Sequence, residues 1–313
     1  MEILTFKYEE TPSINERIVL CLGFFDGVHL GHQSLIKKAL NEGYKVGVLS
    51  FDNSPGYVLG KTKENFHLTS NSDKAELFEQ LGVDYFFLMH FDENVATLSK
   101  EDFVEKVLKV INPVKIYCGK DFRFGNKGEG DPEFLRNFFE VNDCDFILCD
   151  DEKISTRKIV GLVEEGDMEK VKKRLGRYFR INGLVVEGKH NGRSIDFPTA
   201  NLELDYPYVF PKVGAYTGYA EVAGERYRAI ISVGTHPSVM QLLKPIIEVH
   251  ILEFDGNLYG KDIFVEFAKL LREEKVFASL DELKEQLQKD KKIGKRVLKI
   301  LEERENNKNN LPS

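Results

Sequence analysis

The hydrophobic positions in the first half of the chain follow two alternating patterns. Short continuous apolar runs are typical of strands buried on both faces of a sheet, and segments with apolar residues at helical spacing separate them. Strand alternating with helix is the order of a doubly wound α/β domain, so we predict a parallel sheet covered on both faces. The predicted strands are 18–22, 46–51, 84–91, 114–119 and 145–150, and the predicted helices are 33–41, 72–82, 99–111 and 132–142.

The pattern changes near residue 178. Two helical stretches within 157–176 end in glycines that suit helix C-caps, and the helical spacing then disappears. Short β-branched and aromatic runs with Gly, Asn or Pro between them predict an antiparallel barrel, and 280–303 predicts a terminal helix. We therefore expect two domains, 1–178 and 179–313. The predicted barrel strands are 180–188, 215–222, 225–234, 246–254 and 262–271.

Composition and charge narrow the class of protein. Of 313 residues, 42% are hydrophobic and 30% are charged, which is ordinary for a protein with a packed core. The net charge of −7 gives no general attraction to nucleic acid, and no apolar run approaches the length of a membrane span. The four cysteines lack a short paired spacing and fit a reducing compartment. We expect a cytoplasmic monomer or weak oligomer that binds small molecules, without nucleic-acid or membrane partners.

The first predicted strand leads into a turn rich in glycine and histidine, GFFDGVHLGH at 23–32. A glycine-containing turn between a parallel strand and a helix offers free N–H groups and a helix N-terminus, which suit a phosphate. His29 and His32 could donate hydrogen bonds to phosphate oxygens and stabilise charge during group transfer. Zinc is disfavoured, because the pair has no third ligand nearby and lacks the glutamate of HExxH.

A second segment, SPGYVLGKT at 54–62, approaches the spacing of a P-loop. Pro55 stands where that motif requires glycine, and no clear helix follows the segment. We therefore assign it no phosphate-binding role.

Several motifs, taken together, resemble those of one enzyme family. The turn at 23–32 resembles the xFDGxHxGH signature of nucleotidyltransferases, and GKDFRFGNKGEGD resembles a segment of the FAD synthetase module. Three later motifs resemble riboflavin kinase: FPTANL at 197–202, IEVHILEFDGNLYGKDIFVEF at 247–267 and LREEKVFASLDELKEQLQKD at 271–290. The chain thus resembles bifunctional riboflavin kinase/FAD synthetase over nearly its whole length. The resemblance implies a Rossmann-like nucleotidyltransferase domain followed by a riboflavin kinase barrel.

For the second domain, the resemblance implies phosphorylation of riboflavin to FMN by ATP. Thr199 and Asn201 would contact Mg²⁺ and phosphate oxygens, which suits oxygen ligands to a hard cation. Glu248 would be the base for the ribityl hydroxyl and would contact the flavin, as would Arg272. The further nucleotide-binding residues implied are Gly188, Gly192 and Pro198.

For the first domain, the resemblance implies transfer of the adenylyl group of ATP to FMN, giving FAD and pyrophosphate. No protein nucleophile is required, so His29, His32, backbone amides and Mg²⁺ would stabilise the transition state. The nucleotide-binding residues implied are Gly23, Phe25, Asp26, Gly27, Gly31, Asp121, Phe124 and Arg157.

In its first domain the sequence departs from the family pattern at two places, so two alternatives to the bifunctional hypothesis stay open. ISTRKIV at 154–160 has Val160 where the family has an arginine that helps hold the triphosphate, and SFDNSP at 50–55 replaces TFDPHP. One alternative is a riboflavin kinase whose N-terminal domain is inactive or retargeted. The other is a non-catalytic, flavin-binding regulatory protein.

Overall fold

The computed structural model describes residues 1–62, 64–187, 198–237 and 243–309, without the side chains of 235–237, 243–245 and 308–309. By the contacts between residues, the chain divides into two compact units, Met1–Thr156 and Arg157–Ser313. The sequence pattern places the linker helices with the first domain, whereas their contacts group them with the barrel.

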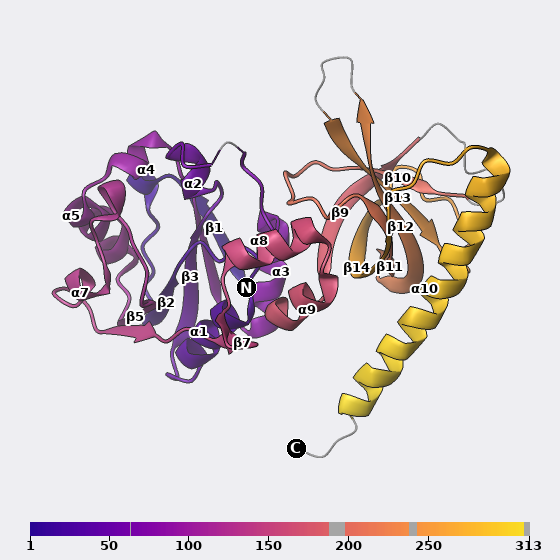
Figure 1. The fold of residues 1–313 in the computed structure, drawn as a ribbon. Helices are drawn as coiled ribbons and strands as arrows, with labels where there is room; N and C mark the ends of the chain where they lie inside the picture. The colour runs from indigo at the N-terminus through magenta and orange to yellow at the C-terminus, as the bar shows by residue number, and fades with distance from the viewer. Residues whose placement is uncertain (63, 188–197, 238–242, 310–313) are drawn as a thin grey trace. The chain divides into compact units, whose positions relative to one another are not determined.

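The first unit is built on a parallel sheet. In the part of the chain that the structure describes, its strands lie in the order β1-β4-β3-β2-β5-β6, and every neighbouring pair is parallel (Figure 1). The chain moves outward from β2 to β3 and β4, and then crosses to β5 on the other side of β2. This reversal is the switch point of a doubly wound fold, outside which ligands bind. The strands are β1 (Glu2–Phe6), β2 (Ile18–Leu22), β3 (Lys45–Phe51), β4 (Tyr85–Met89), β5 (Lys115–Gly119) and β6 (Val141–Cys144).

Helices cover both faces of this sheet, because alternate strand residues point to opposite sides. Val19 and Cys21 of β2 pack with α1 and α3 on one face, and Ile18 and Leu20 pack with helical residues 103–111 on the other. The helical segments are η1 (Tyr8–Glu10), α1 (Leu30–Leu40), α2 (Pro55–Val58), α3 (Asn71–Leu81), α4 (Glu93–Thr97), α5 (Lys100–Phe103), the π-helical η2 (Val104–Leu108), α6 (Lys109–Ile111), η3 (Asn126–Gly128) and α7 (Pro132–Leu135).

The two edges of the sheet differ from the prediction. The helix predicted at 132–142 is wrong beyond Leu135, and the last strand is β6, not 145–150. An edge strand pairs on one side only and can therefore be partly exposed, as VNDC in β6 is. The prediction followed apolar content and so placed the strand in the next six residues. Leu148–Cys149 (β7) instead pairs with Glu152–Lys153 (β8) as a small hairpin. The other edge strand, β1, is largely exposed and was not predicted.

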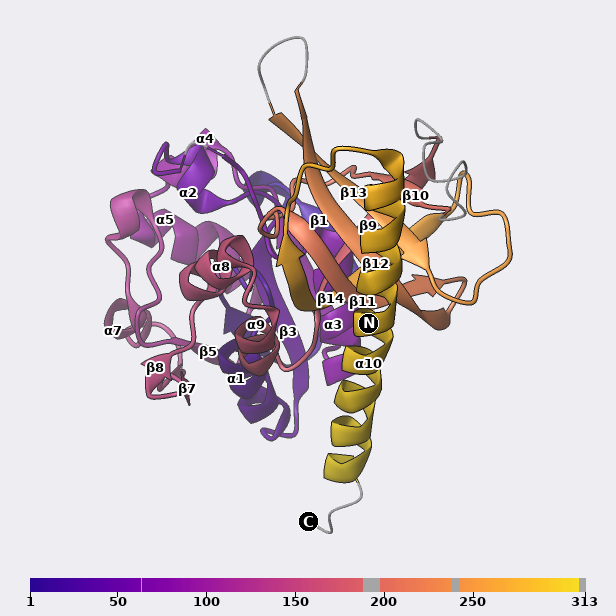
Figure 2. The same ribbon diagram turned by 45° about the vertical axis from the view of Figure 1, so that its right-hand side comes forward.

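The second unit is an antiparallel barrel. Its described strands close in the order β10-β13-β12-β11-β14-β9, preceded by α8 (Thr156–Glu165) and α9 (Met168–Leu175). The long helix α10 (Leu280–Asn309) lies along the barrel and contacts β11, β12 and β14 (Figure 2). The predicted fold class is confirmed. The barrel strands are β9 (Phe179–Val186), β10 (Ala200–Glu203), β11 (Gly214–Val222), β12 (Glu225–Pro237), β13 (Leu243–Ile251) and β14 (Asp262–Glu273).

No helix among the described residues combines the length and the apolar character needed to cross a membrane.

A glycine sets the distance between α10 and the barrel. A Cβ atom at Gly294 would lie 2.5 Å from Cδ1 of Ile230 and 2.9 Å from Oγ1 of Thr217. By contrast, a Cβ at Gly161 in α8 would meet no heavy atom of the described residues within 4 Å, apart from its own helix backbone and its chain neighbours. These two helical glycines thus differ in whether the surroundings leave room for a side chain.

We expect Gly294→Ala to lower the free energy of unfolding of the barrel unit by about 1–3 kcal/mol, because the methyl group overpacks the interface. Gly161→Ala is the matched control and should raise it by up to about 1 kcal/mol through helix propensity. Urea unfolding of both variants measures the difference. Equal effects of the two substitutions would show that packing at Gly294 does not matter.

Candidate active sites

The GFFDGVHLGH turn has an unusual backbone that its neighbours hold in place. Val28 has a φ of 38°, which is rare for a β-branched residue, and Gly27 has a φ of 79°. The Ser50 hydroxyl donates to the carbonyl of Phe24 (2.7 Å), and the Gly27 amide donates to Oγ1 of Thr69 (3.0 Å). A strained backbone persists only where its surroundings determine it, so this turn is a pre-organised element.

The Asp26 side chain points into the protein and braces this turn. Its Oδ1 accepts the backbone N–H groups of Leu68 (2.9 Å) and Thr69 (3.1 Å), while the Thr156 hydroxyl donates to the Asp26 carbonyl (3.1 Å). The residue is 3% exposed, and burial raises the pKa of its carboxyl group. Asp26 therefore fixes the turn against the segment before α3, and direct nucleotide binding by it stays a prediction.

His29 and His32 meet at the start of α1. His29 is the N-cap residue, and its Nδ1 accepts the backbone N–H of His32 (3.3 Å), which leaves the ring proton of the neutral form on Nε2. The two rings stack with centroids 3.5 Å apart. A Cβ atom at Gly31 would lie 3.1 Å from Cε1 of His29, so the glycine between the histidines leaves room for the capping ring.

His32 is held in its uncharged form. Burial, followed by the neighbouring His29 and Lys74, lowers its pKa well below the usual value. Its Nδ1 is buried and has no hydrogen-bond partner among the residues that the structure describes. The Phe25 ring packs against it edge-on at 5.1 Å. The site thus offers a neutral imidazole, that of His32, in the first turn of a helix.

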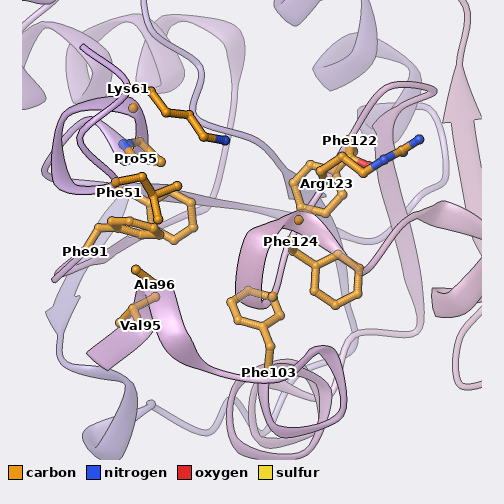
Figure 3. Close-up of a pocket in the computed structure, with 14 residues that line it drawn as sticks. Phe51, Pro55, Lys61, Phe91, Val95, Ala96, Phe103, Phe122, Arg123 and Phe124 are labelled. Carbon is orange, nitrogen blue, oxygen red and sulfur yellow. The ribbon is translucent and has the colours of Figure 1, made fainter. Parts of the chain in front are cut away.

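An aromatic cavity of about 240 Å³ lies at the carboxyl ends of β3, β4 and β5. In Figure 3, Phe51 and Phe91 stand on one side, and Phe103 and Phe124 stand on the other. Lys61 also lines the cavity and extends toward the space between the two sides. The cavity is therefore mainly apolar, with a cation beside it.

Other predicted residues of this domain occupy separate positions. Gly23 is the first residue of the turn, and a Cβ there would lie 3.1 Å from the ring of Phe25. The exposed Asp121 pairs with Nζ of Lys153 at 2.6 Å. Arg157 is exposed in the first turn of α8. Binding of a nucleotide by Asp121 and Arg157 stays a prediction.

The barrel register brings several predicted kinase residues into one row. Asn201 of β10 lies opposite Glu248 of β13, and Glu248 lies opposite Ser232 of β12. Ser232 faces Ala215, which faces Arg272 of β14. Directly opposite residues share a face of a sheet, with Cβ atoms about 4.5–5.5 Å apart. Asn201 and Glu248 are therefore neighbours, and Arg272 lies further along the same row.

A second cavity, of about 410 Å³, opens beside the PTAN segment. Pro198 and Thr199 line it together with apolar side chains such as Val249 and Phe254. Asn201 and Glu248 are absent from its described lining, because alternate strand residues point to the other face. Gly188 and Gly192, predicted to bind ATP, lie outside the described residues.

Arg272 is held by the terminal helix. Its Nε and a terminal nitrogen lie 3.0 and 2.9 Å from Oδ2 of Asp290, whose side chain is 2% exposed. Gln286 donates a further hydrogen bond to Asp290 (2.8 Å). The Arg272 side chain is 23% exposed, so a flavin contact by it stays a prediction.

Comparisons with known proteins identify the family. The FAD synthetase family model matches residues 11–160, and the riboflavin kinase model matches 175–298. The bifunctional riboflavin kinase/FMN adenylyltransferase of Bacillus subtilis is 36% identical, over 87% of this chain and 90% of that protein. The chain belongs to the bifunctional riboflavin kinase/FMN adenylyltransferase family. Its counterpart in Escherichia coli K12 is 34% identical over 93% of this chain and 96% of that protein.

A solved structure has the same two-domain architecture. The crystal structure of a macrolide-efflux protein from Streptococcus pneumoniae superposes with a TM-score of 0.88 at 28% identity, covering 94% of this chain and 99% of that one. The two family models and the relatives above confirm the family resemblance stated from the motifs. Two features of the structure were not predicted from the motifs: the aromatic cavity, and the ion pair between Arg272 and Asp290.

We expect Asp290→Asn to lower the free energy of unfolding of the barrel unit by about 2–3 kcal/mol. Removing one partner of a buried ion pair leaves the other charge uncompensated, and the partial exposure of Arg272 moderates the loss. Glu285→Gln is the control, since its carboxylate lies 3.9 Å from Lys289 on the exposed side of the same helix. Its effect should stay within about 0.5 kcal/mol. A loss of similar size in both variants, measured by urea unfolding, would rule out a special role for the buried pair.

Proposed function

We propose that the barrel phosphorylates riboflavin to FMN with ATP, and that the sheet domain transfers the adenylyl group of a second ATP to FMN. The observation that carries this proposal is that each half of the chain matches the family model of one of these activities. In the sheet domain the histidine pair and the aromatic cavity support adenylyl transfer, and in the barrel the register that makes Asn201 and Glu248 neighbours supports the kinase site.

In adenylyl transfer, a phosphate oxygen of FMN attacks the α-phosphorus of ATP. The bond between that phosphorus and the bridging oxygen of the leaving pyrophosphate breaks, and no bond to the enzyme forms. Negative charge grows on the phosphate oxygens, and His29 and His32 donate hydrogen bonds to them from the start of α1. The buried Nδ1 of His32, without a partner among the described residues, supports a ligand at this place.

The aromatic cavity suits the flavin ring of FMN. Its phenylalanine walls, among them Phe51 and Phe124, provide flat apolar surfaces for a planar aromatic ligand. Lys61 attracts the FMN phosphate by its positive charge. The cavity and the histidine pair both lie at the carboxyl ends of the sheet strands, so FMN bound here points its phosphate at the nucleotide site.

In the kinase reaction, the primary hydroxyl of riboflavin attacks the γ-phosphorus of ATP, the bond to ADP breaks, and Glu248 accepts the hydroxyl proton. The cavity beside Thr199 has an apolar lining that suits the adenine base. The oxygen atoms of Thr199 and Asn201 fit a hard cation and would hold Mg²⁺. When bound, Mg²⁺ neutralises phosphate charge.

Exchanging one residue in each site tests whether the activities are separate. Glu248→Gln removes the base and should lower FMN formation at least about 100-fold, while FAD formation from supplied FMN continues. His29→Ala removes a donor to the transition state and should lower FAD formation about 100-fold or more, while FMN formation continues. Product chromatography with riboflavin or FMN and MgATP measures both. Loss of both activities in either folded variant would contradict two independent sites, and wild-type protein that makes no FAD would favour a retargeted N-terminal domain.

Shortening one wall of the aromatic cavity tests the flavin site. Phe124→Ala should raise the KM for FMN in FAD formation about 10- to 100-fold, because the flavin loses apolar contact area. The KM for riboflavin in FMN formation should stay unchanged. Phe138→Ala, at an exposed phenylalanine outside the cavity lining, is the control. An unchanged KM for FMN in Phe124→Ala would place the flavin elsewhere.

A further inference from the structure

A lysine is buried between the two halves of the proposed adenylyl-transfer site. Lys74 of α3 is 1% exposed, and its Nζ donates to the carbonyl of Phe51 (3.0 Å). The same atom lies 5.0 Å from the ring centroid of Phe24. Phe24 belongs to the turn that carries the histidine pair, and Phe51 lines the aromatic cavity. The ammonium group therefore lies between the two elements that we propose to bind ATP and FMN.

The structure gives this ammonium group little compensation for its burial. Among the described residues, Lys74 forms no ion pair within 4.0 Å. The two carboxylates whose charges favour the protonated lysine are bonded to other groups: Asp26 accepts backbone amides, and Asp52 binds Nδ1 of His90 (2.7 Å) and the amide of Phe91 (3.0 Å). A buried charge without a partner is costly and is retained where another group supplies the counter-charge. In the proposed adenylyl-transfer site, the phosphates of ATP and FMN would supply negative charge beside it.

The titratable groups that face Lys74 come from four elements. They are Asp26 after β2, Asp52 after β3, His32 in α1 and His67 before α3. Burial lowers the pKa of Lys74 to about 8, against the opposing effects of Asp26 and Asp52. After burial itself, the charge of Lys74 further lowers the pKa values of His32 and His67. The region thus combines neutral imidazoles with one buried positive charge.

We propose that Lys74 is a positioning residue for adenylyl transfer. Its ammonium group fixes the carboxyl end of β3 through the hydrogen bond to the Phe51 carbonyl. It also supplies a buried positive charge that reduces the repulsion between the phosphates of FMN and ATP. In a site with little water, one charge acts over several ångströms, so direct contact with substrate is not needed. The proposal rests on the placement of adenylyl transfer at His29 and His32.

Two variants and a pH profile test this role. Lys74→Met keeps the chain length without the charge and should lower kcat/KM for FAD formation at pH 7 by about tenfold or more. Lys74→Arg keeps the charge and should retain most of the activity.

The pH profile is the second test. Since the protonated form of Lys74 is active, wild-type FAD formation should fall as the pH rises through about 8. This fall should occur at higher pH in Lys74→Arg and should be missing in Lys74→Met. FMN formation by the same preparations reports that the barrel unit is folded, and the activity of Lys74→Arg reports that a variant at this position keeps the sheet domain folded.

The outcomes separate this proposal from the one on which it rests. Full FAD formation in Lys74→Met, together with loss in His29→Ala, would overturn the role of Lys74 and leave the histidine site standing. Full activity in both would overturn the histidine site itself. Equal losses in Lys74→Met and Lys74→Arg, with a wild-type profile that is flat between pH 7 and 9, would mean that Lys74 only fills space.

Discussion

The pairing of β2 with both β3 and β5 is the constraint on which the first domain depends. Val19 lies opposite Val46 on one side and opposite Lys115 on the other, so the backbone hydrogen bonds fix three parallel strands in one register. Parallel strands end at the same edge of a sheet, and the segments after β2, β3 and β5 therefore converge there. At this edge lie the histidine pair, Phe51 at the end of β3, and Phe124, which are distant in the sequence. Lys74 reaches the same place from α3 and ties the first two segments together.

In the barrel, too, strand register determines which side chains become neighbours. Here it matters because alternate residues of each strand point to opposite faces. A shift of β10 by one residue would turn Asn201 away from Glu248 and place its neighbours on the wrong face. His250 helps to prevent such a shift, because its Nδ1 donates to the carbonyl of Pro198 (2.8 Å), just before the strand begins. Asp290 of α10 orients Arg272 in the same row. The proposed kinase site thus depends on strand pairing and on one helix packed against the barrel.

Sequence patterns predicted what depends on local periodicity and on motifs. The buried strands, the long helices, the barrel and both families could be found because each has continuous apolar runs or a specific residue order. The edge strands β1 and β6 could not, since a strand paired on one side needs little apolar content. The segment 54–62 was set aside as a failed P-loop, yet Pro55 and Lys61 line the aromatic cavity. The sequence around Lys74 predicts an ordinary, exposed helix lysine. Its burial depends on tertiary packing and could not be predicted from the sequence.

The central claim is that FMN and ATP meet at the switch point of the sheet, between the aromatic cavity and the histidine pair. A crystal structure of the full chain with FMN, Mg²⁺ and α,β-methylene ATP tests it most directly, because this analogue cannot transfer its adenylyl group. The flavin ring should lie between Phe51 and Phe124, with the phosphates over His29 and His32. Clear density for FMN or for the triphosphate of the N-terminal domain away from these residues would contradict the claim.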